Sequence, residues 1–213
     1  MPKFPLYLLS GNDESRLLNE TRRLVHDLAG PDADELSLEI CKEGDDRGPD
    51  AVLLALLGAI QTPPFLGGSK TIWLSQFSAF AMEPSQSDKE PRGVAGALAA
   101  LSNLLAEGLP EGVQVVLSGP GVDKRKRLHR TCDGQGEVRF FDRPDPSKAA
   151  GRAELARLLQ EEAGRRQMTL RREVVEYLTD LIGGDTGRLA NEVEKLFCYA
   201  GPTPQLGAGR RDL

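Results

Sequence analysis

The stretch TPPFLGGSKTIWL, residues 62–74, contains residue types that bind phosphate in many ATPases. A Walker phosphate loop has the pattern GxxxxGK[ST] and lies between a strand and the N-terminus of a helix. Here the residue before Lys70 is Ser69 rather than Gly, and Lys70 and Thr71 lead into an apolar strand pattern instead of a helix. The segment therefore predicts no phosphate-binding loop.

The proper place for such a loop is after the first predicted strand, in LLSGNDESRLLNE. No Lys faces the phosphate position there, and Asp13 and Glu14 would repel an anion. The fourth predicted strand ends in Leu117-Ser118-Gly119 and lacks the acidic pair that would hold Mg²⁺. The sequence thus predicts the outline of a P-loop NTPase domain that has no catalytic residues and needs no cofactor.

Other reactive side chains follow no catalytic or metal-binding spacing. Cys41, Cys132 and Cys198 form no CxxC pair, and His26 and His129 are far apart in the chain. We therefore predict no metal site and expect incidental thiols in a reduced, cytoplasmic protein. No apolar run approaches the ~20 residues of a membrane span, and the N-terminus does not have the pattern of a signal peptide.

The charge of the chain argues against independent binding to nucleic acid. Its 213 residues carry a net charge of −5, from 27 basic and 32 acidic side chains. Residues 142–213 contain 12 of each sign, so the whole acidic excess lies in residues 1–141. DNA-binding proteins usually carry a basic excess that neutralises phosphates. Taken alone, this chain is expected to bind DNA poorly.

The first two-thirds of the chain alternate between strand patterns and helix patterns, which favours crossover connections and a mostly parallel sheet. Asn12 or Asp13 is expected to cap the first helix. Apolar helix patterns also cover residues 51–61 and 94–107. The predicted strands are residues 6–10, 36–41, 71–74, 113–118 and 138–141.

The pattern changes at the segment RPDPSKAAG, which suits a linker. Only helix patterns follow, over residues 149–166, 171–182 and 186–200, and Asp185 is expected to cap the last of them. We therefore predict an α/β domain over residues 1–142, a three-helix domain over 143–201, and an unstructured tail over 202–213.

Four segments resemble the delta subunit of the bacterial DNA polymerase III clamp loader, an AAA+-type protein. They are YLLSGNDESRLLNETRRL, TPPFLGGSKTIWL, VDKRKRLHR and GGDTGRLANEVEKLFCYAG, and the last is the most specific. The resemblance covers essentially all 213 residues. Family members continue into a helical collar domain, so we expect this chain to represent their first two domains.

The resemblance implies a non-hydrolysing subunit of DNA replication that grips the sliding clamp, the ring-shaped beta subunit, and favours its open form. The gripping pair maps onto Phe65 and Leu66, with Pro64 beside them and Leu57 in the preceding helix. Further implied partners are the ATPase and delta-prime subunits, bound through the collar, and primed DNA within the complex. From the residues alone, Phe65 could equally fold back onto the helix of residues 51–61.

The basic segment DKRKRLHR includes Lys124, Arg125, Lys126 and Arg127. A solvated helix face is the favoured interpretation, and contact with DNA or a neighbouring subunit is the alternative. Arg188 is expected to be structural and to pair with Asp185 or Glu192.

Two other functions remain open. One is a nucleotide-hydrolysing P-loop ATPase, which the loop after the first strand argues against. The other is a scaffold subunit similar to delta-prime, which usually carries zinc-binding cysteines and a Ser-Arg-Cys arginine finger that this sequence lacks.

Overall fold

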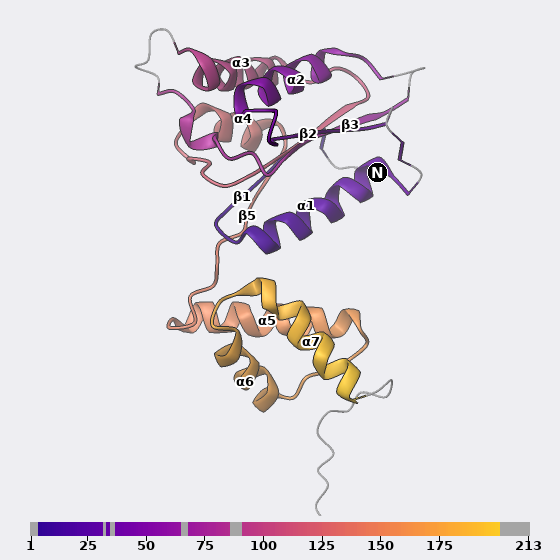
Figure 1. Ribbon diagram of the computed structural model, residues 1–213, viewed down its shortest axis with the longest axis vertical. Helices are drawn as coiled ribbons and strands as arrows, with labels where there is room; N and C mark the ends of the chain where they lie inside the picture. Colours follow the sequence, from indigo (N-terminus) through magenta and orange to yellow (C-terminus); the bar gives the residue numbers. More distant parts are fainter. Residues whose placement is uncertain (1–3, 32, 35–36, 65–67, 86–90, 201–213) are drawn as a thin grey trace, which may run out of the picture. The chain divides into compact units, whose positions relative to one another are not determined.

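A computed structural model describes residues 4–31, 33–34, 37–64, 68–85 and 91–200. The chain divides into two compact units, Met1–Phe141 (unit 1) and Asp142–Leu213 (unit 2). Unit 1 combines a sheet with helices, whereas the described part of unit 2 is built from helices (Figure 1).

The strands of unit 1 form one five-stranded sheet with the spatial order β2-β3-β4-β1-β5, in which all neighbouring strands are parallel. In the centre, Leu8 lies opposite both Leu117 and Val138. The parallel sheet predicted from the alternation of strands and helices is confirmed. The strands are β1 (Leu6–Ser10), β2 (Leu38–Lys42), β3 (Lys70–Ser75), β4 (Val113–Ser118) and β5 (Glu137–Phe140).

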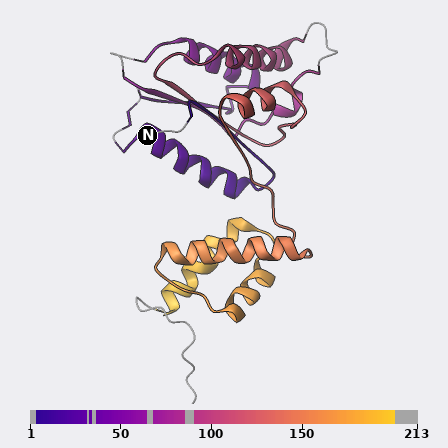
Figure 2. The same cartoon turned by 180° about the vertical axis from the view of Figure 1, so that it is seen from behind.

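Helices cover both faces of this sheet (Figures 1 and 2). One face is covered by α1 (Glu14–Ala29), and the other by α2 (Pro49–Gln61), α3 (Gly93–Glu107) and α4 (Arg127–Gln135). Burial on both faces explains why the central strands are nearly continuous apolar runs. Trp73 packs with the α1 side and Leu74 with the α2–α4 side. The short 3₁₀ helix η2 spans Phe80–Met82.

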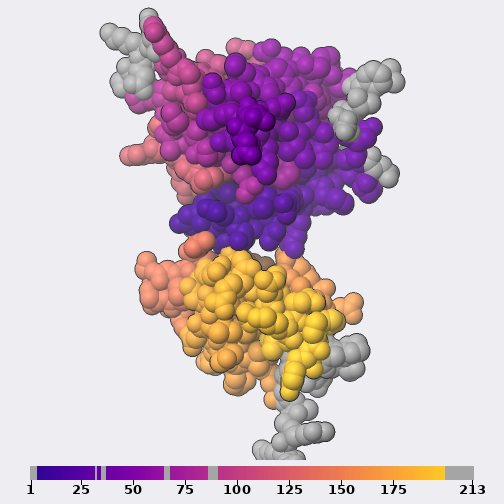
Figure 3. Space-filling view, in the orientation of Figure 1, coloured from indigo at the N-terminus to yellow at the C-terminus, as the bar shows by residue number. Residues whose placement is uncertain are grey.

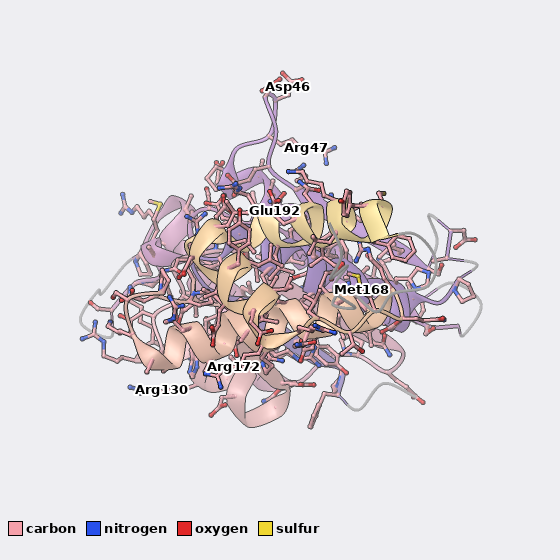
Figure 4. All side chains as sticks on the ribbon, turned by 90° about the horizontal axis from the view of Figure 1, so that it is seen from below. Asp46, Arg47, Arg130, Met168, Arg172 and Glu192 are labelled. Atoms are coloured by element: carbon pink, nitrogen blue, oxygen red, sulfur yellow. The ribbon has the colours of Figure 1, made fainter. Side chains whose placement is uncertain are left out.

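Local sequence signals account for the helix ends of unit 1. Asp13 caps α1 as predicted, since its side chain accepts a hydrogen bond from the backbone N–H of Arg16 at 3.1 Å. Pro49 occupies the first turn of α2, where its missing N–H costs nothing. Between β2 and α2, a narrow turn with Asp46 at its tip projects from unit 1 (Figure 4).

The basic segment was predicted as one helix over residues 123–130, and this is wrong at its start. The helix α4 begins only at Arg127, and residues 124–126 form a turn. The side chain of Asp123 accepts a hydrogen bond from the backbone N–H of Arg125 at 2.9 Å. This local bond offers the backbone an alternative to the helix.

Unit 2 contains the helices α5 (Ala149–Arg165), α6 (Arg172–Ile182) and α7 (Thr186–Ala200). Their bounds agree with the predicted helices to within a residue. The space-filling view shows α7 across the face of unit 2 that is turned to the viewer (Figure 3). The buried core of this unit includes Leu159, Met168, Leu178, Leu189 and Val193.

A tight turn joins α6 to α7. Gly183 ends α6 in the left-handed conformation, and Gly184 follows with a φ of 90°. The Asp185 side chain then accepts from the backbone N–H of Gly187 at 3.1 Å, so the predicted cap of α7 is confirmed. Arg188 lies 3.7 Å from a carboxylate oxygen of Glu192, one of its two predicted partners.

In the part of the chain that the structure describes, none of the helices combines the length and the apolar character needed to cross a membrane.

Candidate functional site

The predicted gripping turn is held at its base by Lys70. This residue opens β3, and its backbone N–H donates to the carbonyl of Gly112 at 2.8 Å. Its ammonium donates to the carbonyl of Ala59 in the last turn of α2 at 3.2 Å and lies 2.7 Å from a carboxylate oxygen of Glu39. Lys70 therefore joins α2, β2 and β3, and its charge is occupied by these partners rather than presented to a phosphate.

Both described flanks of the turn pack against Gly112, which has a φ of 77°. A Cβ atom at this position would lie 2.8 Å from the carbonyl oxygen of Gly68 and 3.0 Å from Cγ of Pro64. The close approach explains a glycine here, because any side chain would push these flanks apart. Pro64, a predicted site residue, is half-buried in this contact.

The two residues of the predicted gripping pair, Phe65 and Leu66, lie outside the described residues. Their role therefore remains a prediction. Leu57, the fourth predicted contact residue, is partly buried and packs against the core beneath α2. It supports the helix that leads into the turn.

The outer face of α2 is apolar, in addition to its buried inner face. Leu54 is 65% exposed, and Ala51, Ala55 and Gly58 are exposed on the same side of the helix. We call these four residues the α2 strip. Exposed apolar surface of this kind often marks a protein contact. The strip is therefore a candidate second part of the contact surface predicted at the turn. Sequence analysis did not single out Leu54 because an apolar helix does not reveal which leucines face outward.

The loop after β1, where an NTPase would bind phosphate, is closed by backbone contacts. Gly11 has a φ of 141°, and a Cβ atom there would lie 2.0 Å from the carbonyl oxygen of Phe141. The same oxygen accepts a hydrogen bond from the backbone N–H of Asp13 at 3.0 Å. The Asp13 carboxylate caps α1, so a negative group already lies at the helix end that a phosphate would need.

A cavity of about 190 Å³ remains beside the start of α1, at the carboxyl edge of the sheet. This edge is the usual ligand position in parallel α/β proteins. The described lining includes Glu14, Leu17, Leu18 and Pro120 but no Lys or Arg. Its lining is mainly apolar and its one charged group is negative, which does not suit a nucleotide phosphate.

Arg125, Lys126 and Arg127, three of the four predicted basic contact residues, line one cavity, but the four side chains have different contacts. Lys124 lies over the ring of Phe140, with its ammonium 3.9 Å from the ring centre. Arg125 pairs with Asp123 at 2.9 Å. The other two are Lys126, whose ammonium donates to the backbone carbonyl of Glu83, and Arg127, which opens α4 and lines this cavity.

Glu83 is a buried residue of this region that sequence reasoning missed. Its carboxylate accepts a hydrogen bond from the backbone N–H of Leu128 at 2.8 Å and so caps α4 from a distant part of the chain. Burial raises the pKa of this carboxyl, although the Leu128 N–H and the Lys126 ammonium act in the opposite direction. A capping residue 45 positions away leaves no local sequence signal.

The three thiols are placed as separate groups. Cys41 and Cys132 are buried, which raises the pKa of Cys41 to about 11 and that of Cys132 to about 12. Cys198 is exposed on α7. The described residues bring together no cluster of three or more His, Cys, Asp or Glu side chains that could hold a metal ion.

Comparison with solved structures shows the fold. The structure of the DNA clamp loader delta protein of Bacillus subtilis matches with a TM-score of 0.60 and 21% identity, over 92% of this chain and 54% of that one. This chain thus spans about half the length of that protein. No protein-family model and no curated protein sequence matches the chain.

Two looser structural matches are also found. One is a DNA polymerase III gamma subunit-related protein of Thermotoga maritima, with a TM-score of 0.48, 18% identity, and coverage of 92% of this chain and 54% of that one. The other is a chain of the HORMA–CdnC–Trip13 complex of Escherichia coli MS115-1, with a TM-score of 0.47, 16% identity, and coverage of 95% and 70%. The chain therefore has a P-loop NTPase-like fold that it shares with a clamp loader delta protein.

Proposed function

We propose that this chain is a non-catalytic subunit of a DNA clamp loader, and that it binds a ring-shaped sliding clamp. The observation that carries the proposal is the fold it shares with the Bacillus subtilis clamp loader delta protein along 92% of its length. The closed loop after β1 supports a role without nucleotide hydrolysis, because Asp13 and Phe141 take up the position of a phosphate loop.

Phe65 and Leu66, which follow Pro64 in the chain, are the proposed anchor of the clamp contact, and Leu57 is proposed to support it from the preceding helix. Burying two large apolar side chains in a partner contributes about 3–6 kcal/mol before the costs of association. The contacts of Lys70 with α2 and of Gly112 with both flanks of the turn form a frame that fixes the ends of the turn. This frame favours such a contact, since a turn with fixed ends loses less conformational freedom on binding. The α2 strip provides further exposed apolar area on the helix that precedes the turn.

Opening of the clamp follows if the anchor binds the open ring more tightly than the closed ring. The ring then shifts toward the open form by at most the difference between the two binding free energies. In this proposal ATP acts on partner ATPase subunits that expose or hide the anchor. Primed DNA is engaged within the assembled loader.

Surface plasmon resonance on the immobilised cognate clamp tests the proposal, with the whole chain as analyte and without ATP. Wild-type protein is expected to bind. The Phe65→Ala/Leu66→Ala variant is expected to lose about 2 kcal/mol or more of binding free energy, as is typical when hot-spot residues are truncated. A matched control is Tyr177→Ala/Tyr199→Ala, which removes two side chains of unit 2 that are 66% and 88% exposed. This control is expected to bind like wild type.

The outcomes separate the function from the site. No binding by wild-type protein would remove the clamp-binding proposal. Equal binding by wild type and the Phe65→Ala/Leu66→Ala variant would keep clamp binding and reject the anchor. A parallel assay should detect no ATP hydrolysis by the purified chain, and hydrolysis that follows the protein through purification would contradict the non-catalytic role.

A further inference from the structure

A second cavity, of about 660 Å³, lies in unit 1 on the side of the sheet covered by α3 and α4. Its walls come from the end of η2, the middle of α3, and the segment that leads into α4. The volume falls in the range of small-molecule sites. It shares no described lining residue with the frame of the turn or with the smaller cavity beside α1.

The described part of the lining carries more basic than acidic side chains, although unit 1 as a whole is acidic. Two of its described residues are carboxylates, and both already have partners. Asp123 accepts from the guanidinium of Arg125 at 2.9 and 3.1 Å, and Glu83 accepts from the backbone N–H of Leu128 at 2.8 Å. The basic side chains of the lining are Arg125, Lys126, Arg127 and Arg130.

Within the described chain, Arg125 pairs with the Asp123 carboxylate and the Lys126 ammonium donates to the backbone carbonyl of Glu83, whereas the guanidinium groups of Arg127 and Arg130 have neither kind of partner. They are three positions apart on α4, so they lie on one side of the helix. Both are exposed, and the side chain of Arg130 extends away from the ribbon (Figure 4). A guanidinium presents several N–H donors in a fork that matches the oxygens of a phosphate.

Ser102 supplies the second, independent observation. This residue of α3 is 1% exposed and forms part of the cavity wall. Its Oγ has no hydrogen-bond partner among the described residues. Buried polar groups in folded proteins almost always have a hydrogen-bond partner. A buried hydroxyl without one indicates that a ligand or solvent molecule supplies the missing hydrogen bond.

We propose that this cavity binds a phosphate group. The guanidinium groups of Arg127 and Arg130 are the charged donors, and the hydroxyl of Ser102 on α3 is a neutral donor. A phosphate carries several acceptor oxygens and can use all three donors together. The site is separate from the closed loop after β1, and it does not depend on the proposed binding of a clamp. The phosphate belongs either to a small free ligand or to the backbone of a nucleic acid.

Titrations of the whole chain at low salt test this site with two probes. Inorganic pyrophosphate, followed by calorimetry, represents the free ligand. A fluorescent oligo-deoxythymidine, followed by anisotropy, represents the nucleic acid backbone. The Arg127→Gln/Arg130→Gln variant is expected to bind at least about tenfold more weakly to whichever probe binds the wild-type chain, because charge-assisted hydrogen bonds are lost.

Ser102→Ala distinguishes a built site from a patch of surface charge. We expect it to weaken binding about three- to tenfold without lowering the free energy of unfolding, since its hydroxyl bonds to no described residue. The control is Arg22→Gln/Arg23→Gln, which removes the same charge from α1 on the opposite face of the sheet. It is expected to change affinity less than about twofold, because distant exposed charges are screened.

The probes also identify the source of the phosphate. A nucleic acid backbone is supported if the oligonucleotide binds more tightly than pyrophosphate. The salt dependence of its affinity should then be smaller in the Arg127→Gln/Arg130→Gln variant. Binding of pyrophosphate alone supports a small ligand. The proposal is overturned if neither probe binds, if the α1 control loses as much affinity as the α4 variant, or if Ser102→Ala binds like wild type.

Discussion

The ammonium of Lys70 donates a hydrogen bond to the carbonyl of Ala59 at 3.2 Å and so joins the start of β3 to the last turn of α2. The carbonyls of a last helical turn lack partners within the helix, and positive charge is favourable beside them. Residues 62–69 lie between these two joined elements. The lysine of an ATPase-like sequence segment thus holds the base of the proposed clamp-binding turn.

Replacing this lysine should weaken unit 1. Lys70→Met keeps much of the side-chain length but removes the donor to Ala59 and the partner of Glu39. We expect a loss of about 1–3 kcal/mol in the free energy of unfolding, measured by urea denaturation, because the Ala59 carbonyl loses its charged donor and Glu39 loses its ion-pair partner. Lys42→Met, an exposed change at the end of β2, should stay within about 0.5 kcal/mol of wild type. Equal stability of the two variants would reject the structural role of Lys70.

The elements that the sequence predicted best are those whose signals are local and strong. The strand Val113–Ser118 is buried in the sheet centre and is therefore mostly apolar. The turn at Gly183 and Gly184 combines two glycines with an Asp cap, and this places the start of α7 at Thr186. These features need no distant partner, so the one-dimensional pattern is sufficient.

The features that the sequence did not predict depend on distant or competing contacts. The Glu83 carboxylate caps α4 across 45 positions, and the Lys70 ammonium reaches Ala59 across 11. Residues 124–126 have helix-favouring side chains, yet the Asp123 carboxylate holds the backbone in a turn. The orphan hydroxyl of Ser102 is also invisible in the sequence, because a serine in an apolar helix pattern gives no sign of its surroundings.

The raised pKa of Glu83 predicts a pH-dependent stability. Burial is the main cause, and the charged neighbours of the carboxyl are Lys126 and Asp123. The folded chain then binds this proton more tightly than the unfolded chain does, so the stabilisation is complete below the unfolded pKa of about 4.3 and is lost as pH rises through the folded value. Glu83→Gln removes this dependence while keeping an acceptor for Leu128.

Urea denaturation at a series of pH values measures this effect. From about pH 4 upward, the free energy of unfolding of wild type should fall relative to that of Glu83→Gln, and the difference should level off above the folded pKa. Glu107→Gln, an exposed change at the end of α3, serves as the control and should follow wild type. Parallel curves for wild type and Glu83→Gln would contradict the assignment.

The environments of the thiols predict very different reactivities. Burial raises the pKa of Cys41 to about 11 and of Cys132 to about 12, so at pH 8 both are thiols without solvent access. Cys198 is exposed. Ellman's reagent should therefore modify one thiol rapidly in the native protein, and the other two only after unfolding. Cys198→Ser should abolish the rapid phase, and a rapid phase that survives this change would contradict the burial of the other thiols.

Gly184 is the residue of the α6–α7 turn that tolerates a side chain least. Its φ of 90° is unfavourable for other residues, and a Cβ atom would lie 2.7 Å from the carbonyl oxygen of Pro144. Gly184→Ala should therefore destabilise unit 2 by about 1–3 kcal/mol. In Gly164→Ala, by contrast, the new methyl group on α5 meets no atom within 4 Å and should stabilise the helix by about 0.5–1 kcal/mol. Thermal unfolding followed by helical circular dichroism compares the two. Opposite signs are expected, and a neutral Gly184→Ala would show that the turn adapts to a side chain.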